Sequence, residues 1–332
     1  MAGRHRINVT ARRQHYVWRK YLEPWTTKKG RVPQIWCLRR EGPAPIRLGI
    51  TNAAVQRDFY RLHNLERGDV EFVRAIGISQ NTNPTARETN ERWISMIGEM
   101  IDGMIGMQRE LRDRLSESPQ LREELDRVMI EHHENDYSRM ESRAVAHLEA
   151  LQGGDVTFFA VDEEAIKFSY FLAHQYFRTK AIRDRIRDTF PSQSDKERFE
   201  RTWPILRYVF ATNIGCEIFR SRKSVKLQVV EAAPGMKFIT SDQPAINTYG
   251  AFVPERTPIE EMELFYPVSP TRAVILSGHP VYQDTHGKAL EPFRMGVLNQ
   301  AIERVAYEQL FADSDYALNP LVPYFCTGDT AG

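Results

Sequence analysis

The chain has 332 residues, of which 42% are hydrophobic and 11% aromatic. This is enough apolar material for a sizeable core and excludes an intrinsically disordered protein. The 45 basic and 44 acidic residues leave a formal net charge of +1, which argues against a general nucleic-acid coat protein, because such a protein should be clearly basic. A local basic patch is compatible with this balance.

The cysteines and the hydropathy pattern predict a cytoplasmic protein that does not contact a membrane. Cys37, Cys216 and Cys326 form an odd, sparse set without C-x-x-C spacing, which fits a reducing compartment and gives neither a zinc knuckle nor a disulfide framework. The N-terminus is polar and lacks an apolar signal core. No stretch reaches the roughly 18 apolar residues that a membrane span needs.

The N-terminal part of the chain predicts a basic arm followed by strands. Residues 1–14 are basic and are expected to be flexible. Strands are predicted at Gln34–Arg39 and over residues 46–50, within a strand-bearing region at 15–70. Asn52 is expected to cap a short helix, since its side chain can accept a hydrogen bond from a free helical N–H.

Residues 85–220 have the periodicity of long helices. Apolar residues recur at spacings of three and four, as on the buried face of a helix, and prolines or glycines separate the runs. Four helices are predicted over residues 85–115, 121–151, 163–189 and 196–219.

Strand patterns return over residues 225–280. Pro234-Gly235 is typical of a turn between two strands. The predicted elements are strands over residues 225–232, 236–240, 264–266 and 272–276, a last helix over 297–310 and a tail over 316–332.

The order of these elements predicts an α+β fold. The N-terminal and C-terminal strands are expected to meet in one mixed or antiparallel sheet, and the central block of long helices packs against it. The length suits two domains or one large one, and we expect a single large domain over residues 15–315.

Four polar clusters interrupt the apolar pattern, and the first is His15, with Arg19 and Lys20 close by. A histidine is suited to general acid–base catalysis because its unperturbed pKa lies near neutral pH. The alternative is a structural or surface histidine beside the neighbouring aromatic residues.

The second cluster runs from His132 to Glu141. On a helix, Glu134, Ser138 and Glu141 share one face, and an adjoining apolar stripe places Glu141 near the core boundary. The alternative is a solvated face of a charged helix. The spacing of His132, Glu134 and Asp136 matches no known metal signature, and a metal site would need three ligands.

The third cluster is His174, Gln175 and Arg178, which interrupt an apolar helical run and can face one point. Burying an arginine costs several kcal/mol unless it is paired, so a carboxylate or a bound anion is expected beside Arg178. Glu141 and Asp242 are the candidates. The alternative is a purely structural ion pair.

The fourth cluster is Ser241-Asp242, at the end of a predicted strand and just before Pro244. Loops that follow strands often carry functional groups, although an ordinary turn would explain the same residues. A weaker candidate is Asn299 near the start of the last predicted helix, where capping is the stronger explanation.

The standard signatures of several large enzyme classes are absent. The chain contains no G-x-x-x-x-G-K-[ST] and no G-x-G-x-x-G, which cradle phosphates. It also has no G-x-S-x-G nucleophile elbow.

Taken together, these clusters resemble a bacterial domain-of-unknown-function family, number 4238. The matching motifs lie in order along residues 15–310: His15-Tyr-Val with Tyr21-Leu22, Asp58-Phe59-Tyr60, Glu134 to Glu141, Gln175-x-x-Arg178-Thr179, Thr240-Ser241-Asp242-x-Pro244, Pro267-x-Ser269-Pro270, and Asn299. The usual histidine pair of the first motif is Gln14-His15 here, and Trp18 replaces the usual proline. The resemblance implies a mostly prokaryotic protein without settled biochemistry, and some members are associated with anti-phage defence.

Three hypotheses follow. The first is a defence-associated hydrolase or nuclease that acts on nucleic acid or a nucleotide. In it, His15 would be the general acid or base, and Arg178 would neutralise a phosphate. Glu141 and Asp242 would add a second acid or hold magnesium or manganese. The second is a sensor that binds a nucleotide or phage component without catalysis, and the third is a structural polar network. Whether the protein forms a homo-oligomer is also left open by the sequence. The substrate-binding candidates are Arg19, Gln175, Ser241 and Asn299.

Overall fold

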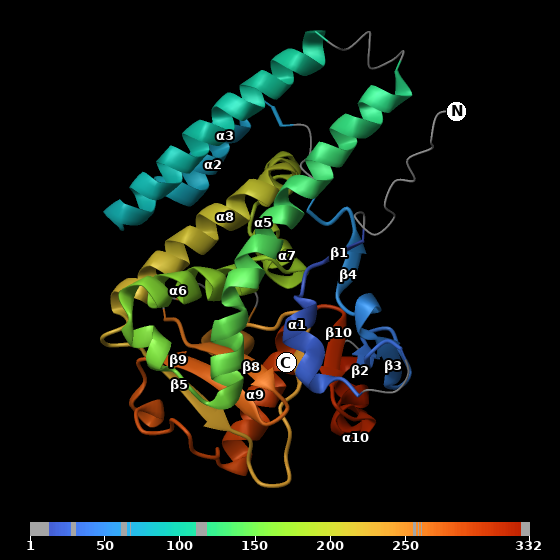
Figure 1. Ribbon diagram of the computed structural model, residues 1–332, viewed down its shortest axis with the longest axis vertical. Helices are drawn as coiled ribbons and strands as arrows, with labels where there is room; N and C mark the ends of the chain where they lie inside the picture. Colours follow the sequence, from blue (N-terminus) through green and yellow to red (C-terminus); the bar gives the residue numbers. More distant parts are fainter. Residues whose placement is uncertain are drawn as a thin grey trace.

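The computed structural model describes residues 13–27, 31–60, 65–66, 68–110, 118–254, 257, 259 and 261–326, with the side chains of 96, 97, 100–110 and 119–135 left out. The fold is α+β, as predicted (Figure 1). Five longer helices form its central block: α3 (Pro84–Glu110), α5 (Pro119–Gly153), α6 (Asp162–Phe177), α7 (Lys180–Arg187) and α8 (Gln193–Ser221).

The first sheet joins the two ends of the chain. It contains β2 (Gln34–Arg39) and β3 (Ile46–Gly49) from the N-terminal part, and β6 (Thr240–Ser241) and β10 (Gln309–Ala312) from the C-terminal part. The order is β3-β2-β10-β6 and every pairing is antiparallel. The prediction that strands from both ends meet in an antiparallel sheet is therefore confirmed for these four strands, whereas the other C-terminal strands form a second sheet.

The second sheet has the order β5-β9-β8-β7, again antiparallel. Its strands are β5 (Lys226–Glu231), β7 (Ile246–Asn247), β8 (Leu264–Ser269) and β9 (Arg272–Ser277). The predicted hairpin around Pro234-Gly235 is wrong, because β5 pairs along its whole length with β9 and β6 belongs to the first sheet. Six paired residues satisfy more backbone groups than the two-residue β6 could.

Both faces of the second sheet are buried. Leu227 and Val229 of β5 pack in the cluster that includes residues of α5 and α6, whereas Val230 packs with residues of α9 (Pro292–Val305). This alternation is the two-residue period of a strand between two layers. The resulting order is helices, sheet, helix, and α3 with the upper part of α5 projects away from the sheets (Figure 1).

A two-stranded ribbon carries the first polar cluster. Strand β1 (Arg13–His15) pairs antiparallel with β4 (Val55–Arg57). The helix predicted from Asn52 is wrong, because Ala54 has a left-handed φ of 44°. Tertiary hydrogen bonds hold it there: the Ala54 N–H donates to Gln309 Oε1 at 3.0 Å and its carbonyl accepts from the Tyr16 N–H.

Two helix boundaries differ from prediction. The helix predicted over residues 163–189 breaks between α6 and α7 at Arg178 and Thr179, where Thr179 is extended. The last long helix is α9, which starts with Pro292 at its first turn rather than at residue 297. Residues 309–312 form β10 instead.

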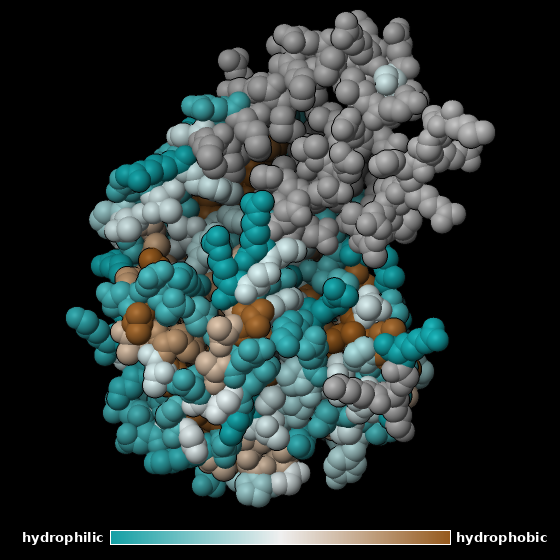
Figure 2. All heavy atoms as spheres, viewed as in Figure 1, coloured by the Kyte–Doolittle hydropathy of each residue, from teal (hydrophilic) through white to brown (hydrophobic). Residues whose placement is uncertain are grey.

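The other described helices are short. They are α1 (Arg19–Leu22), α2 (Asp69–Val73), α10 (Asp315–Leu318) and α11 (Val322–Phe325), with 3-10 or π turns at Glu23–Trp25, Ile50–Asn52, Arg74–Ile78, Thr157–Ala160, Thr248–Ala251, Pro280–Tyr282 and Asn319–Leu321. Within the described part of the chain, no helix has the length and apolar character needed to cross a bilayer. Figure 2 shows a mostly hydrophilic described surface with small apolar patches.

Candidate functional site

A cavity of about 740 Å³ lies between the N-terminal segment and α5. It brings together three of the predicted catalytic residues, His15, Glu141 and Arg178, and the predicted substrate-binding residue Arg19. Its lining residues are His15, Trp18, Arg19, Lys20, Glu23, Arg31, Val32, Pro33, Ile50, Thr51, Tyr60, Tyr137, Ser138, Glu141, Ser142, Val145 and Arg178.

Arg178 has the carboxylate partner that its burial requires. Its Nη1 donates to Glu141 Oε1 at 2.5 Å, and only 2% of the Arg178 side chain is exposed. Burial raises the pKa of Glu141 above its ordinary value, and the opposite charge of Arg178 works against this rise. Of the two expected partners, the one found is therefore Glu141.

His15 stands beside this ion pair on β1. Burial, followed by the positive charge of Arg19, lowers the pKa of His15 to about 4, although a hydrogen bond with the Thr51 backbone opposes the change. The imidazole is therefore neutral at pH 7. Its Nε2 finds no hydrogen-bond partner in the described part of the chain. The His15 carbonyl accepts hydrogen bonds from Arg178 Nη2 at 2.8 Å and from the Tyr60 hydroxyl at 2.9 Å, so the ion pair also fixes the strand that holds this histidine.

The cavity lining carries more basic than acidic side chains. Lys20 is paired with Glu23 at 3.1 Å. In contrast, Arg19 and Arg31 form no ion pair with any residue that the structure describes. Two exposed arginines beside a cavity provide donors for an anionic ligand.

The polar pair at the end of β6 lies outside the lining of this cavity. The buried Asp242 carboxylate accepts three backbone hydrogen bonds, from Tyr307 at 2.8 Å, Glu308 at 2.7 Å and Gln309 at 3.2 Å. Burial raises the pKa of Asp242 to about 6, and these hydrogen bonds partly offset the rise. Ser241 Oγ accepts from the Gln243 N–H at 3.0 Å. Ser241 therefore forms a local turn, as the alternative explanation expects, whereas Asp242 joins the end of β6 to the distant segment 307–309.

Asn299 also has structural partners. Its amide donates to the Lys237 carbonyl at 2.9 Å and its oxygen accepts from the Ile239 N–H at 3.2 Å. It lies inside α9 rather than at a helix start. The expected cap is therefore wrong, and the side chain instead holds the segment that leads into β6.

His174 and Gln175 are fully buried on α6. The His174 ring faces a second group of residues that sequence reasoning missed. This group, the arginine–tyrosine centre, consists of Arg207, Tyr60, Tyr137 and Tyr208. The Arg207 guanidinium lies 4.5 Å from the centre of the Tyr60 ring and 5.2 Å from that of Tyr137. The His174 ring contacts Tyr208 at 4.9 Å. The signal was one arginine within the apolar run 203–211 of α8.

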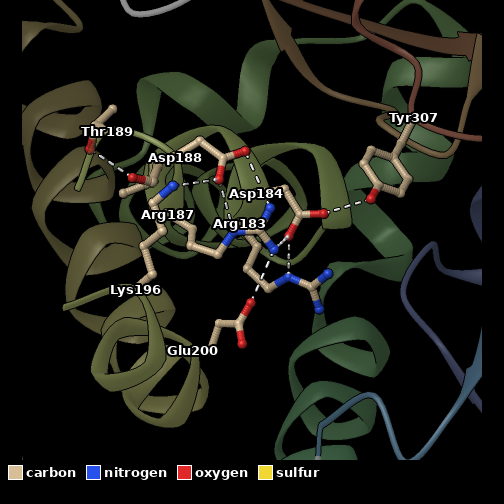
Figure 3. Close-up of polar contacts among 9 residues, drawn as sticks. Arg183, Asp184, Arg187, Asp188, Thr189, Lys196, Glu200 and Tyr307 are labelled. Atoms are coloured by element: carbon tan, nitrogen blue, oxygen red, sulfur yellow. Dashed lines mark hydrogen bonds and ion pairs between the residues drawn. The ribbon is translucent and has the colours of Figure 1, made fainter. Parts of the chain in front are cut away.

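An ion network fixes α7 directly after Arg178 and Thr179 (Figure 3). Arg187 bridges Asp184 at 3.2 Å and Glu200 of α8 at 3.0 Å, and the Tyr307 hydroxyl donates to Asp184 at 2.7 Å. Burial alone would raise the pKa of Asp184, but hydrogen bonds from Arg183 and Tyr307 lower it. The network ties the end of α6 to α8 and to the segment before β10.

No metal centre is formed by the described side chains, among which no three His, Cys, Asp or Glu residues gather. His132 and Glu134 of the second polar cluster lie outside the described side chains. The magnesium or manganese proposed from the sequence therefore stays a prediction.

The family to which this chain belongs is the one named DUF4238 and described as a protein of unknown function, whose model matches residues 13–315. The match spans the cavity, both four-stranded sheets and the arginine–tyrosine centre. No curated protein and no solved structure has significant similarity to the chain.

Proposed function

We propose that the cavity binds a phosphate-bearing ligand, either a nucleotide or a single nucleic-acid strand, and hydrolyses a phosphate ester in it. The observation that carries this proposal is that Arg19 and Arg31, which have no ion-pair partner among the described residues, line the same cavity as a neutral His15. Guanidinium groups bind phosphate oxygens through two parallel N–H donors.

His15 is the proposed general base. A neutral imidazole can take the proton of an attacking water while the water oxygen bonds to phosphorus and the ester oxygen leaves, taking a proton from solvent. Arg178 and Glu141 are positioning residues in this scheme, since Arg178 holds the His15 carbonyl and Glu141 holds Arg178. A divalent ion, magnesium or manganese, is retained as a proposed cofactor.

Binding without catalysis is the second candidate, and a separate observation favours it. The Nε2 atom of His15 is shielded from solvent, and both predicted acids are engaged, Glu141 by Arg178 and Asp242 by backbone N–H groups. A sensor would need the arginines but no proton transfer.

The test separates the two candidates. The protein and its His15→Gln and Arg19→Ala variants are incubated with single-stranded RNA, single-stranded DNA and nucleoside triphosphates, with and without magnesium or manganese. Arg220→Ala, an exposed arginine at the far end of α8, is the matched control. Product that disappears in His15→Gln while binding persists supports hydrolysis; ligand recovered intact, with binding dependent on Arg19, supports a sensor. A folded wild type that binds none of these probes rejects both.

The cellular setting is also a proposal. Three cysteines without disulfides among the described residues and the lack of a membrane-spanning helix in the same part of the chain support a cytoplasmic site of action. The anti-phage role and homo-oligomerisation remain predictions from the sequence.

A further inference from the structure

Among the described residues, Arg207 has no acceptor for its hydrogen bonds. Its side chain is completely buried, and its Nε, Nη1 and Nη2 atoms have no hydrogen-bond partner among the described residues. Because taking a guanidinium out of water is costly, a buried arginine ordinarily has a carboxylate or several carbonyl oxygens around it.

The same helix shows the ordinary arrangement. Six residues earlier on α8, Arg201 donates to both oxygens of Asp69, at 2.7 and 2.9 Å. Arg178 is likewise paired with Glu141. The described side chains therefore supply a carboxylate to two arginines of this region and none to Arg207.

The aromatic rings around Arg207 satisfy its charge only in part. Tyr60, Tyr137 and Tyr208 lie 4.5, 5.2 and 5.5 Å from the guanidinium, and the faces of such rings attract cations. Ring faces cannot accept the N–H groups that point outward in the guanidinium plane. An oxygen acceptor is still required.

Further donors lie on the neighbouring helix. His174 Nδ1 is 3.4 Å from the Tyr137 hydroxyl. When that hydroxyl donates, the imidazole hydrogen is on Nε2, for which the described residues provide no acceptor. The positive charges of Arg207 and Arg178, after burial, keep the pKa of His174 well below its ordinary value. The Gln175 amide, three residues before Arg178, and Arg178 Nε also have no hydrogen-bond partner among the described residues.

From this excess of buried donors, we propose that the arginine–tyrosine centre is an oxyanion site that takes a phosphate group, with Arg207 and His174 as its main donors. Tyr60 and Tyr137 line the cavity and also face Arg207, so the site lies directly behind the cavity wall. The phosphate is either free inorganic phosphate or the terminal phosphoryl group of a cavity ligand. The second source rests on the proposed function.

Inorganic phosphate tests the site directly. Thermal unfolding of the full chain is measured with and without phosphate at constant ionic strength, for wild type, Arg207→Met and the control Arg201→Met. Phosphate is expected to raise the wild-type Tm by about 2–5 °C. Arg207→Met should be at least as stable as wild type without phosphate and should lose the phosphate response. Arg201→Met should have a lower Tm and keep the response.

A wild type that phosphate does not stabilise, or an Arg207→Met variant that still responds, overturns the proposal. Should Arg207→Met not fold, Arg207→Lys keeps the charge and loses the planar fork. Calorimetry is then expected to show phosphate affinity reduced by at least about tenfold. Unchanged affinity in that variant would also overturn it.

A nucleoside triphosphate separates the two phosphate sources and the two proposals. Binding weakened by both Arg19→Ala and Arg207→Met places the terminal phosphoryl group at Arg207. A phosphate response without triphosphate binding leaves the oxyanion site standing and rejects the proposed function of the cavity. Triphosphate binding that Arg207→Met does not change, together with no phosphate response, rejects the oxyanion site and keeps the cavity function.

Discussion

The region around Asp242 and the centre around Arg207 are both buried and both charged, and they differ in what supplies the hydrogen-bond partners. Three backbone N–H groups converge on the Asp242 carboxylate. None of the Arg207 nitrogen atoms has an acceptor among the described residues. The first region is complete within its own chain, whereas the second has more donors than acceptors.

This difference distinguishes buried polar groups that only stabilise the fold from buried polar groups that could bind a ligand. A buried polar group that the fold satisfies contributes to a unique structure, and Asp242 fastens β6 to the segment that leads into β10. A buried group that the fold leaves unsatisfied calls for an explanation outside the chain. The cavity beside His15 and the arginine–tyrosine centre share Tyr60 and Tyr137, and so form the part of the molecule where a ligand is expected.

The largest effect is expected from Asp242→Ala. The variant leaves three buried N–H groups without an acceptor, and the free energy of unfolding should fall by about 3–5 kcal/mol. Urea denaturation measures this loss, and the exposed Asp284→Ala should change stability by less than about 0.5 kcal/mol. A stable Asp242→Ala protein that has lost ligand binding would contradict the comparison and return Asp242 to the site.

Glu141→Gln should have the next largest effect. It leaves the buried Arg178 without its counter-charge, which is expected to lower the free energy of unfolding by about 2–4 kcal/mol. The double variant Glu141→Gln/Arg178→Met should recover part of that loss, because both charges are then gone. Losses that simply add would show that the two side chains do not interact.

His15 in the cavity and Asp242 at the end of β6 should make contributions of opposite sign to the pH dependence of stability. The pKa of His15 is lowered to about 4, so its stabilising contribution is complete above about pH 6.5 and is lost as the pH falls toward 4. The pKa of Asp242 is raised to about 6, so its contribution is complete below about pH 3.9 and is lost as the pH rises through 6.

The two contributions oppose each other between pH 4 and 6. His15→Gln should therefore make stability fall more steeply, relative to wild type, as pH rises through this window, by about 1–2 kcal/mol overall. Asp242→Asn should shift the slope in the other direction. Urea titrations at several pH values measure both slopes, and two variants with the same change of slope would refute the opposite signs.

The smallest effect on stability is expected from Arg19→Ala, because this side chain is exposed. Binding of a phosphate-bearing ligand should weaken about tenfold, which corresponds to about 1.4 kcal/mol, while the unfolding midpoint stays unchanged. Calorimetry measures the affinity. Equal affinity in Arg19→Ala and wild type would remove this arginine from the site.

Much of the fold followed from periodicity, since β2, β3, β8, β9 and the long helices lie close to their predicted ranges. The exceptions depend on distant partners. Ala54 adopts its left-handed conformation against Gln309, and β5 passes over its nearest neighbour in sequence to pair with β9. The secondary-structure propensity of a short segment does not encode either of these long-range interactions.

The candidate site could be predicted where a single residue, by its own chemistry, requires a particular kind of partner. A buried arginine needs a carboxylate, and this requirement alone predicts Glu141 as one of two candidate partners for Arg178. Asp242 was harder to interpret, because the three N–H groups that bind it belong to residues 307–309. Arg207 was missed because it lies within a strongly apolar run, which was interpreted only as the buried part of a helix.

The pairing of β2 with β10 has a consequence for the order of folding during synthesis. Strand β2 leaves the ribosome long before its neighbour β10, which begins at Gln309, so all the residues between the two strands must emerge before the first sheet closes. Contacts this distant in sequence form slowly and late. The ribbon that carries His15 also depends on Gln309 through Ala54. A chain that stops before Gln309 therefore lacks the frame of its cavity, and any activity of the cavity has to wait until β10 has been synthesised.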